Sequence, residues 1–118
     1  FYDWNILLNK EGGPNHVGNY CDAPFLFDED RKELLQRMSA DYYWHFAHFI
    51  QPGAVRLGFS RYTDEIDVTA WENPDGRIVL ILLNRGDKAI PAHIRISGKE
   101  TEIVLSAHSI VSGVISGE

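Results

Sequence analysis

Residues near the start of the chain are of types that could bind a sugar. Trp4 is followed by a loop of turn-forming residues, Glu11–Asn15. An indole ring offers a flat apolar face on which the C–H groups of a sugar can stack. Asn15 and Asn19 flank this loop, and their amides can both donate and accept hydrogen bonds. A buried Trp beside turn asparagines gives the same pattern, so both interpretations stay open at this point.

Acidic residues could supply the general acid and base of a hydrolase. The chain has seventeen Asp and Glu, with sequence clusters at Asp28–Asp30 and Asp64–Asp67. Both clusters look like solvated connections between elements. We therefore predict no catalytic carboxylate pair within this chain.

Two histidines have a spacing that a metal ion could use. His45 and His48 are three residues apart, and Asp41 precedes His45 by four. No third ligand of matching type lies nearby, and the surrounding residues are largely aromatic. A packed helix is the favoured interpretation, and we predict neither a metal nor another cofactor.

Two further short features have simple structural explanations. Arg85-Gly86-Asp87 spells a cell-adhesion tripeptide, but turn chemistry alone favours Gly and Asp there. The single cysteine, Cys21, has no basic neighbour in sequence, so we expect a small buried side chain and not a reactive thiol.

Composition limits the class of protein. A chain of 118 residues with 44% hydrophobic residues can form one modest core. The net charge of -6 and the scattered Lys and Arg argue against a nucleic-acid partner. No apolar run approaches the roughly 20 residues of a membrane-spanning helix.

The elements that would position these residues divide near Pro52. Before it, we expect a strand at Phe1–Asn9, an extended piece at Pro24–Phe27 and a helix at Asp41–Ile50. Local propensity alone also favours a helix at Arg31–Met38. After Gly53 the pattern becomes six short runs separated by turns, which predicts an antiparallel β-sandwich.

The order of motifs resembles glycoside hydrolase family 30, the glucosylceramidase family. The matching motifs are Asp3-Trp4-Asn5, Gly12-Gly13-Pro14-Asn15, Gly18-Asn19, Asp22, Pro24, His45-Phe46, Phe49-Ile50, Pro52-Gly53-Ala54 and the hairpin sequence NPDGRIVLILLNRGDKAI. The resemblance implies that residues 1–51 are the last strand, loop and helix of a (β/α)8 barrel and that residues 52–118 form a β-sandwich. It also implies extended structure, not a helix, in DRKELLQRMS.

The same resemblance assigns roles to individual residues. Trp4 would line the subsite for the sugar that is cleaved off, and Asn19 would reach the same pocket. The residues that shape the loop would be Gly12, Gly13, Pro14 and Asn15.

Family members are retaining glycosidases, which need two glutamates roughly 5–5.5 Å apart. The acid–base glutamate typically follows an Asn, and this chain contains no Asn-Glu dipeptide. We therefore expect both catalytic residues upstream of Phe1, in a parent enzyme that hydrolyses β-glucosidic bonds, and we expect this chain to be inactive alone.

Separation from the barrel has a further consequence. We expect apolar residues at the chain start, Phe1, Tyr2, Ile6 and Leu7, to be exposed, and the result to be self-association or disorder near the N-terminus. The main alternative is a free-standing carbohydrate-binding or immunoglobulin-like module with no enzymatic parent. Neither interpretation predicts the cellular location.

Overall fold

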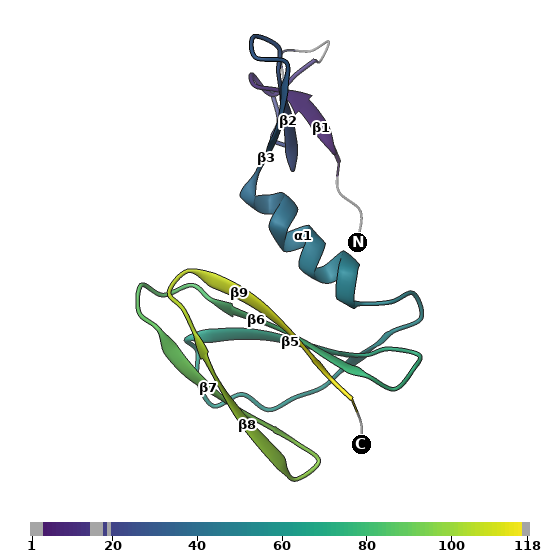
Figure 1. The fold of residues 1–118 in the computed structure, drawn as a ribbon, viewed down its shortest axis with the longest axis vertical. Helices are drawn as coiled ribbons and strands as arrows, with labels where there is room; N and C mark the ends of the chain where they lie inside the picture. Colours follow the sequence, from purple (N-terminus) through teal and green to yellow (C-terminus); the bar gives the residue numbers. More distant parts are fainter. Residues whose placement is uncertain (1–3, 15–17, 19, 117–118) are drawn as a thin grey trace. The chain divides into compact units, whose positions relative to one another are not determined.

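The computed structural model describes residues 4–14, 18 and 20–116 of the chain. The chain folds as two compact units, Phe1–Trp44 and His45–Glu118 (Figure 1). Helix α1 (Met38–Phe49) runs through the boundary between them. The helix therefore begins earlier than the expected start at Asp41 and ends one residue before Ile50.

The first unit contains a small three-stranded sheet in the order β1-β2-β3. Its strands are β1 (Leu7–Asn9), β2 (Phe25–Asp28) and β3 (Glu33–Gln36). β1 pairs with β2 in parallel, whereas β2 and β3 are antiparallel. Its hydrophobic core is the cluster of Leu8, Ala23 and Leu26, against which Leu35 packs.

Two expectations for this unit need correction. Among the described residues, the expected strand Phe1–Asn9 is extended only at Leu7–Asn9, so Trp4 lies on the segment that leads into β1. The helix suggested by propensity at Arg31–Met38 is wrong, because Glu33–Gln36 is the strand β3. Pairing with β2 outweighs the weak local helix preference, as the family resemblance implied.

The second unit is a β-sandwich of six strands, as the sequence predicted. Four form a sheet in the order β4-β5-β6-β9, and β7 and β8 form a separate hairpin. Every pairing is antiparallel. Their bounds are β4 (Val55–Leu57), β5 (Ile66–Glu72), β6 (Ile78–Asn84), β7 (Ile90–Ile96), β8 (Lys99–Leu105) and β9 (Ser109–Ile115).

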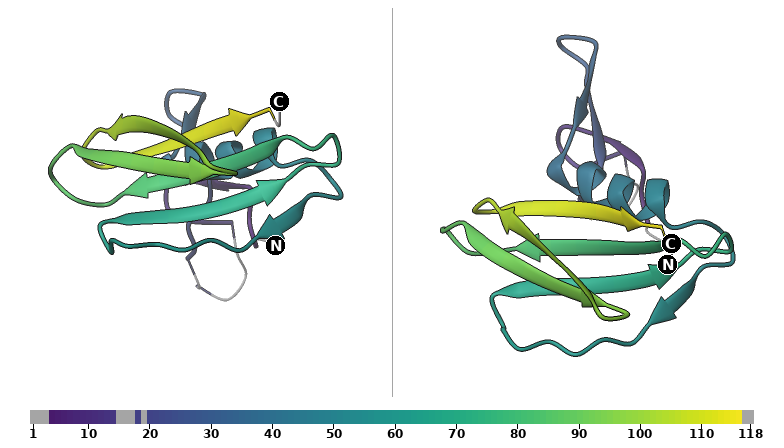
Figure 2. Two further views of the ribbon diagram at one scale, coloured as in Figure 1. Left: turned by 90° about the horizontal axis from the view of Figure 1, so that it is seen from below. Right: turned by 60° about the horizontal axis from the view of Figure 1, so that its bottom comes forward.

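The hairpin covers one face of the larger sheet, as the views in Figure 2 show. The core between the two layers centres on Ile66, Leu82, Ala92 and Leu105. β6 is the central strand of the sandwich, and four successive residues, Val79–Leu82, are buried. This explains why its sequence is a continuous apolar run instead of an alternating one.

Tight turns set the register of the hairpins. Asn73–Gly76 joins β5 to β6, and the N–H of Gly76 donates to the carbonyl oxygen of Asn73 at 2.9 Å. Gly76 has a φ of 84°, a conformation that favours glycine. Ser97 and Gly98 join β7 to β8 with φ of 50° and 78°, the positive pair of a type I′ turn.

Candidate functional site

The candidate sugar-binding residues surround β1. Trp4 precedes the strand and its side chain is 88% exposed, so the indole is not part of a hydrophobic core. The loop Lys10–Pro14 follows the strand. Asn15 and Asn19 lie outside the described residues, so their predicted roles stay predictions.

The loop Lys10–Pro14 is held by hydrogen bonds to Asn9. The backbone N–H of Asn9 donates to the carbonyl oxygen of Gly13 at 2.6 Å, and the N–H of Gly12 donates to the carbonyl oxygen of Asn9 at 3.0 Å. The Asn9 side-chain oxygen, Oδ1, accepts from the N–H groups of Glu11 and Gly13 at 3.1 and 2.8 Å. The peptide bond between Gly13 and Pro14 is cis. Sequence analysis did not identify Asn9, although Asn before a Gly-rich loop is a known turn signal.

Gly12 packs too closely against the neighbouring backbone to carry a side chain. Its carbonyl oxygen accepts from the N–H of Cys21 at 3.0 Å. A Cβ built on Gly12 would lie 2.4 Å from the carbonyl oxygen of Cys21, and its φ is +85°. Glycine alone fits both constraints at position 12, while the predicted loop-shaping role of Gly12 stays a prediction.

Cys21 itself is exposed, so the expected burial of this side chain is wrong. Its backbone N–H donates to the carbonyl oxygen of Gly12, and its side chain lies outside the small core of Leu8, Ala23 and Leu26.

Asp28 is also placed differently from the expectation of a solvated connection. It is 6% exposed, and its Oδ1 lies 3.0 Å from the Nζ of Lys10. Oδ1 also accepts from the N–H groups of Asp30 and Arg31 at 3.0 and 3.2 Å. The hydrogen bond from Lys10 lowers the pKa of the Asp28 carboxyl group, and hydrogen bonds to Asp28 and Asp30 raise the pKa of the Lys10 ammonium group. A carboxylate held in this way is suited to fixing the loop and not to donating a proton.

The acidic cluster Asp64–Asp67 in the second unit also forms ion pairs. Asp67 lies 3.3 Å from Arg61 and 2.7 Å from Arg85, and Asp64 lies 3.4 Å from Arg61. The side chains of Asp64 and Glu65 are exposed, in agreement with a solvated turn.

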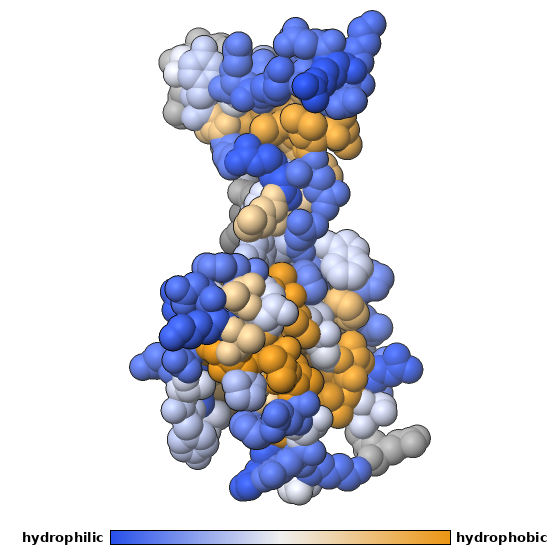
Figure 3. All heavy atoms as spheres, turned by 60° about the vertical axis from the view of Figure 1, so that its left-hand side comes forward, coloured by the Kyte–Doolittle hydropathy of each residue, from blue (hydrophilic) through white to orange (hydrophobic). Residues whose placement is uncertain are grey.

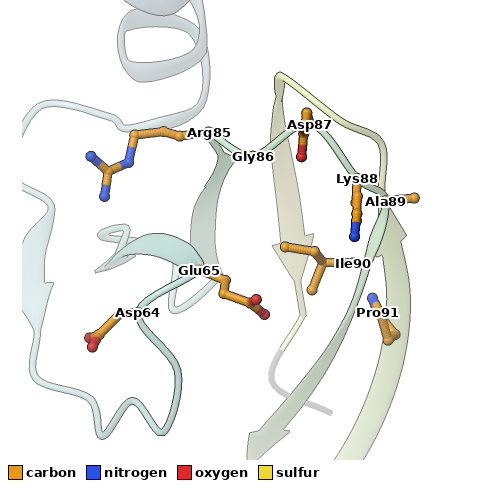
Figure 4. A pocket seen from close by; sticks show the side chains of 9 residues that line it. All are labelled: Asp64, Glu65, Arg85, Gly86, Asp87, Lys88, Ala89, Ile90 and Pro91. Carbon is orange, nitrogen blue, oxygen red and sulfur yellow. The ribbon is translucent and has the colours of Figure 1, made fainter.

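The Arg85-Gly86-Asp87 turn borders a shallow hollow of about 520 Å³ (Figure 4). Arg85 extends away from Asp87 in this view, and its Nε bonds Asp67. The N–H of Gly86 donates to the Asn84 side chain at 2.9 Å. These contacts fix Arg85 and Gly86 to the sandwich itself, and nothing in them favours the adhesion interpretation.

The histidine pair lies on α1 as predicted. The Nδ1 atom of His45 is 2.6 Å from the hydroxyl oxygen of Ser112 on β9, and the ring of His48 lies edge-on to Phe49. Among the described residues, no group of three or more His, Cys, Asp or Glu is arranged to hold a metal ion. Within the same residues, no helix has the length and apolar character needed to span a membrane.

A second hollow lies between the layers of the sandwich, which we call the interlayer cleft. It measures about 1100 Å³ and is lined largely by aliphatic residues of β5, β6 and β7, with Phe59, Arg61 and Tyr62 from the segment after β4. Figure 3 shows hydrophobic residues gathered at the surface of this unit as well as of the first. Polar side chains also line it, among them Ser60, Thr63, Glu65, His93 and Arg95.

Comparison with known proteins identifies relatives of both parts of the chain. Residues 1–51 match the glycosyl hydrolase family 30 TIM-barrel domain, and residues 53–113 match the family 30 beta sandwich domain. Lysosomal acid glucosylceramidase of Mus musculus is 36% identical over 94 residues, which are 78% of this chain and 18% of that protein. Putative glucosylceramidase 1 of Caenorhabditis elegans is 37% identical over 91 residues, 75% of this chain and 17% of that protein.

Two solved structures share the fold. SrfJ from Salmonella typhimurium superposes with a TM-score of 0.93 and 34% identity, covering 98% of this chain and 26% of that chain. The endo-beta1,6-glucanase BT3312 gives a TM-score of 0.80 and 26% identity, covering 92% of this chain and 25% of that chain. The chain thus spans about a fifth of the length of these curated relatives. It belongs to glycosyl hydrolase family 30 and carries the end of the family's barrel domain followed by its β-sandwich domain.

Proposed function

We propose that this chain is the C-terminal part of a retaining β-glycosidase that hydrolyses β-glucosidic bonds. The observation that carries the proposal is the succession of a barrel match at residues 1–51 and a sandwich match at residues 53–113. Several matched relatives bear the name glucosylceramidase, which favours glucose as the sugar. A free-standing carbohydrate-binding or immunoglobulin-like module would give no barrel match.

Within this enzyme, we assign Trp4 to the substrate-binding edge. Its indole is 88% exposed, as a surface that stacks on a sugar requires. Asn19 is proposed to contribute an amide to the same pocket, and Gly12, Gly13, Pro14 and Asn15 to shape the loop. The bonds between Asn9 and Gly13 and the close approach of Gly12 to Cys21 support a loop of defined shape.

The reacting carboxylates are proposed to lie in the portion of the barrel outside residues 1–118. Hydrolysis with retention of the anomeric configuration requires one carboxylate as the nucleophile and a second as the general acid and base. Two carboxylates of this chain are already paired, Asp28 with Lys10 and Asp67 with Arg85. The pKa of Asp28 is lowered, whereas a general acid working at neutral pH needs a raised pKa.

The β-sandwich of residues 52–118 is proposed to have a structural role. Its polar anchors, such as Asn73 and Asn84, bind backbone groups of the sandwich and of the end of α1. We therefore expect its removal to affect folding more than the chemical step.

The experiment that tests this function compares two proteins. One is the pure 118-residue chain, and the other is the complete gene product that contains it. Each is incubated with an aryl β-glucoside, and with the aryl α-glucoside as the stereochemical control. We expect the complete protein to hydrolyse the β-glucoside only, with the β-anomer of glucose released first, and the short chain to match the buffer blank.

Three results would count against the proposal. Hydrolysis by the short chain would show that the catalytic residues lie within it. Initial release of the α-anomer would refute the retaining mechanism. A complete protein that hydrolyses no β-glycoside would refute the function, provided that its circular dichroism shows a folded protein.

A further inference from the structure

One side chain accepts two of the hydrogen bonds that shape the loop Lys10–Pro14. Glu11 and Gly13 both donate their backbone N–H groups to Oδ1 of Asn9, at 3.1 and 2.8 Å. An Asn side chain that caps backbone groups two and four residues later can replace the ordinary hydrogen bonding of a strand or helix. Without this acceptor, both N–H groups would need other partners, and other loop conformations would become accessible.

Other contacts also hold this loop, and the backbone of Asn9 contributes two of them: its N–H donates to the carbonyl oxygen of Gly13 at 2.6 Å, and its carbonyl oxygen accepts from the N–H of Gly12 at 3.0 Å. The Nζ of Lys10 lies 3.0 Å from Oδ1 of Asp28, and the carbonyl oxygen of Gly12 accepts from the N–H of Cys21 at 3.0 Å. The Oδ1 atom of Asn9 adds the N–H of Gly13 to the backbone bond at its carbonyl oxygen, so both backbone polar groups of Gly13 are held where the chain approaches Pro14.

We infer that Asn9 is a positioning residue for the substrate-binding edge of the proposed glycosidase. This inference rests on the proposed function, because the loop that Asn9 shapes matters for catalysis only if that edge contacts sugar. Asn9 acts through the backbone of Glu11 and Gly13 and is not itself required to touch the substrate. Small displacements of a binding group are costly, since misplacement by about 1 Å can reduce the rate about 100-fold.

The chemistry of the contact predicts which replacements are tolerated. Both partners are donors, so the side chain needs an acceptor at the Oδ1 position and makes no use of the amide N–H₂ group in these bonds. Asp provides the same acceptor geometry, Ser provides a shorter and weaker one, and Ala provides none. We expect the affinity for substrate to fall with the residue at position 9 in the order Asn, Asp, Ser, Ala.

The test uses Asn9→Asp, Asn9→Ser and Asn9→Ala, with Gln36→Ala as the matched control. Gln36 lies on the same sheet, and its side chain bonds Asp41, away from the loop. In the complete protein, steady-state kinetics with an aryl β-glucoside separates KM from kcat. We expect Asn9→Ala to raise KM about 10-fold with kcat changed less than about 3-fold. The KM and kcat of Asn9→Asp and of the control Gln36→Ala should stay within about 2-fold of the wild-type values.

A second readout does not depend on catalysis. In the 118-residue chain, hydrogen exchange at the amides of Glu11 and Gly13 is measured by NMR spectroscopy. We expect exchange at these two amides to be about 10-fold faster in Asn9→Ala and nearly unchanged in Asn9→Asp and Gln36→Ala.

The outcomes separate the inference from the function on which it rests. If the complete protein is active and Asn9→Ala has the KM of the wild type, the inference is overturned while the glycosidase function stands. If Asn9→Ala does not fold, the comparison of Asn9→Ser with Asn9→Asp tests the inference instead. Equal KM values for these two variants would overturn it. If the wild type hydrolyses no β-glucoside, both the function and the substrate-positioning role fall, and exchange then reports only on local structure.

Discussion

The side chain of Asn73 caps the end of helix α1 by donating from Nδ2 to the carbonyl oxygen of Phe49 at 2.9 Å. Its Oδ1 accepts from the N–H of Gln51 at 3.0 Å. Asn73 is 5% exposed and sits at the start of the β5–β6 turn. One amide therefore joins the helix end to a turn of the sandwich, all within the second unit.

Removing this amide should destabilise the second unit. We expect Asn73→Ala to lower the free energy of unfolding by about 1–3 kcal/mol, because two part-buried hydrogen bonds, to the carbonyl oxygen of Phe49 and from the N–H of Gln51, are lost. Urea unfolding followed by circular dichroism measures the change. Asp75→Asn is the matched control in the same turn, since its Oδ1 can still accept from the N–H of Arg77, and it should change stability by less than about 0.5 kcal/mol. Equal stability of Asn73→Ala and the wild type would show that the cap contributes nothing.

Two glycines in the first unit should differ in their tolerance of a methyl group. Gly12→Ala combines a positive φ with a clash against the carbonyl oxygen of Cys21, so we expect a loss on the order of 3 kcal/mol or more. Gly18 has a φ of +70° but no heavy atom within 4 Å of the added methyl group. Gly18→Ala should therefore cost only about 1 kcal/mol. The midpoints of urea unfolding of the two variants measure the difference, and a Gly12→Ala variant as stable as Gly18→Ala would contradict the steric explanation.

The ion pair of Lys10 and Asp28 should make stability depend on pH. The pKa of Asp28 is lowered below 3.8 in the folded chain, so the pair adds stability above that pH and loses it as pH falls through the folded value. The pKa of Lys10 is raised above 10.5, so the same stabilisation is lost as pH rises through its folded value. We expect Lys10→Met to reduce stability at about pH 7 and to reduce it by less at about pH 3, below the ordinary pKa of 3.8. Urea unfolding at the two pH values measures this, and an equal loss at both would exclude the ion pair as its cause.

Exposed apolar residues at the start of the first unit should cause self-association. Ile6 and Leu7 are 74% and 51% exposed, while Leu8 on β1 is buried. Phe1 and Tyr2 lie outside the described residues. We expect the sedimentation coefficient of the chain to rise with concentration and that of the Ile6→Lys, Leu7→Lys double variant to stay at the monomer value. Val104→Lys, a change at an exposed position on β8, is the control and should leave association intact. A wild-type chain that sediments as a monomer at all concentrations would refute the expectation.

Much of the sandwich could be predicted because its signals are local. The turn Asn73–Gly76 and the alternation along β7 place strands directly, and six strands are observed. The first unit was harder to predict, because β1 has three residues and its parallel pairing with β2 brings together distant parts of the chain. The weak helix preference of Arg31–Met38 also gave no sign that Glu33–Gln36 would pair with β2 as a strand.

The candidate site shows the same division between local and distant signals. The need for glycine at position 12 could be expected from its Gly-rich surroundings, but its cause is the backbone of Cys21. The burial of Asp28 depends on Lys10, which is distant in sequence, so an acidic run looked like a solvated turn. The proposed roles of Trp4 and Asn19 in sugar binding depend on the family resemblance and not on a local pattern, so they stay proposals.

The interlayer cleft affects how the chain can be studied. Phe59 and Tyr62 line this cleft and are 47% and 98% exposed in the folded protein, so fluorescent dyes that light up in apolar surroundings should bind the native state. Melting curves recorded with such dyes would then begin from a bright baseline and understate cooperativity. Far-ultraviolet circular dichroism, which follows the strands themselves, is the sounder measure of unfolding for this chain.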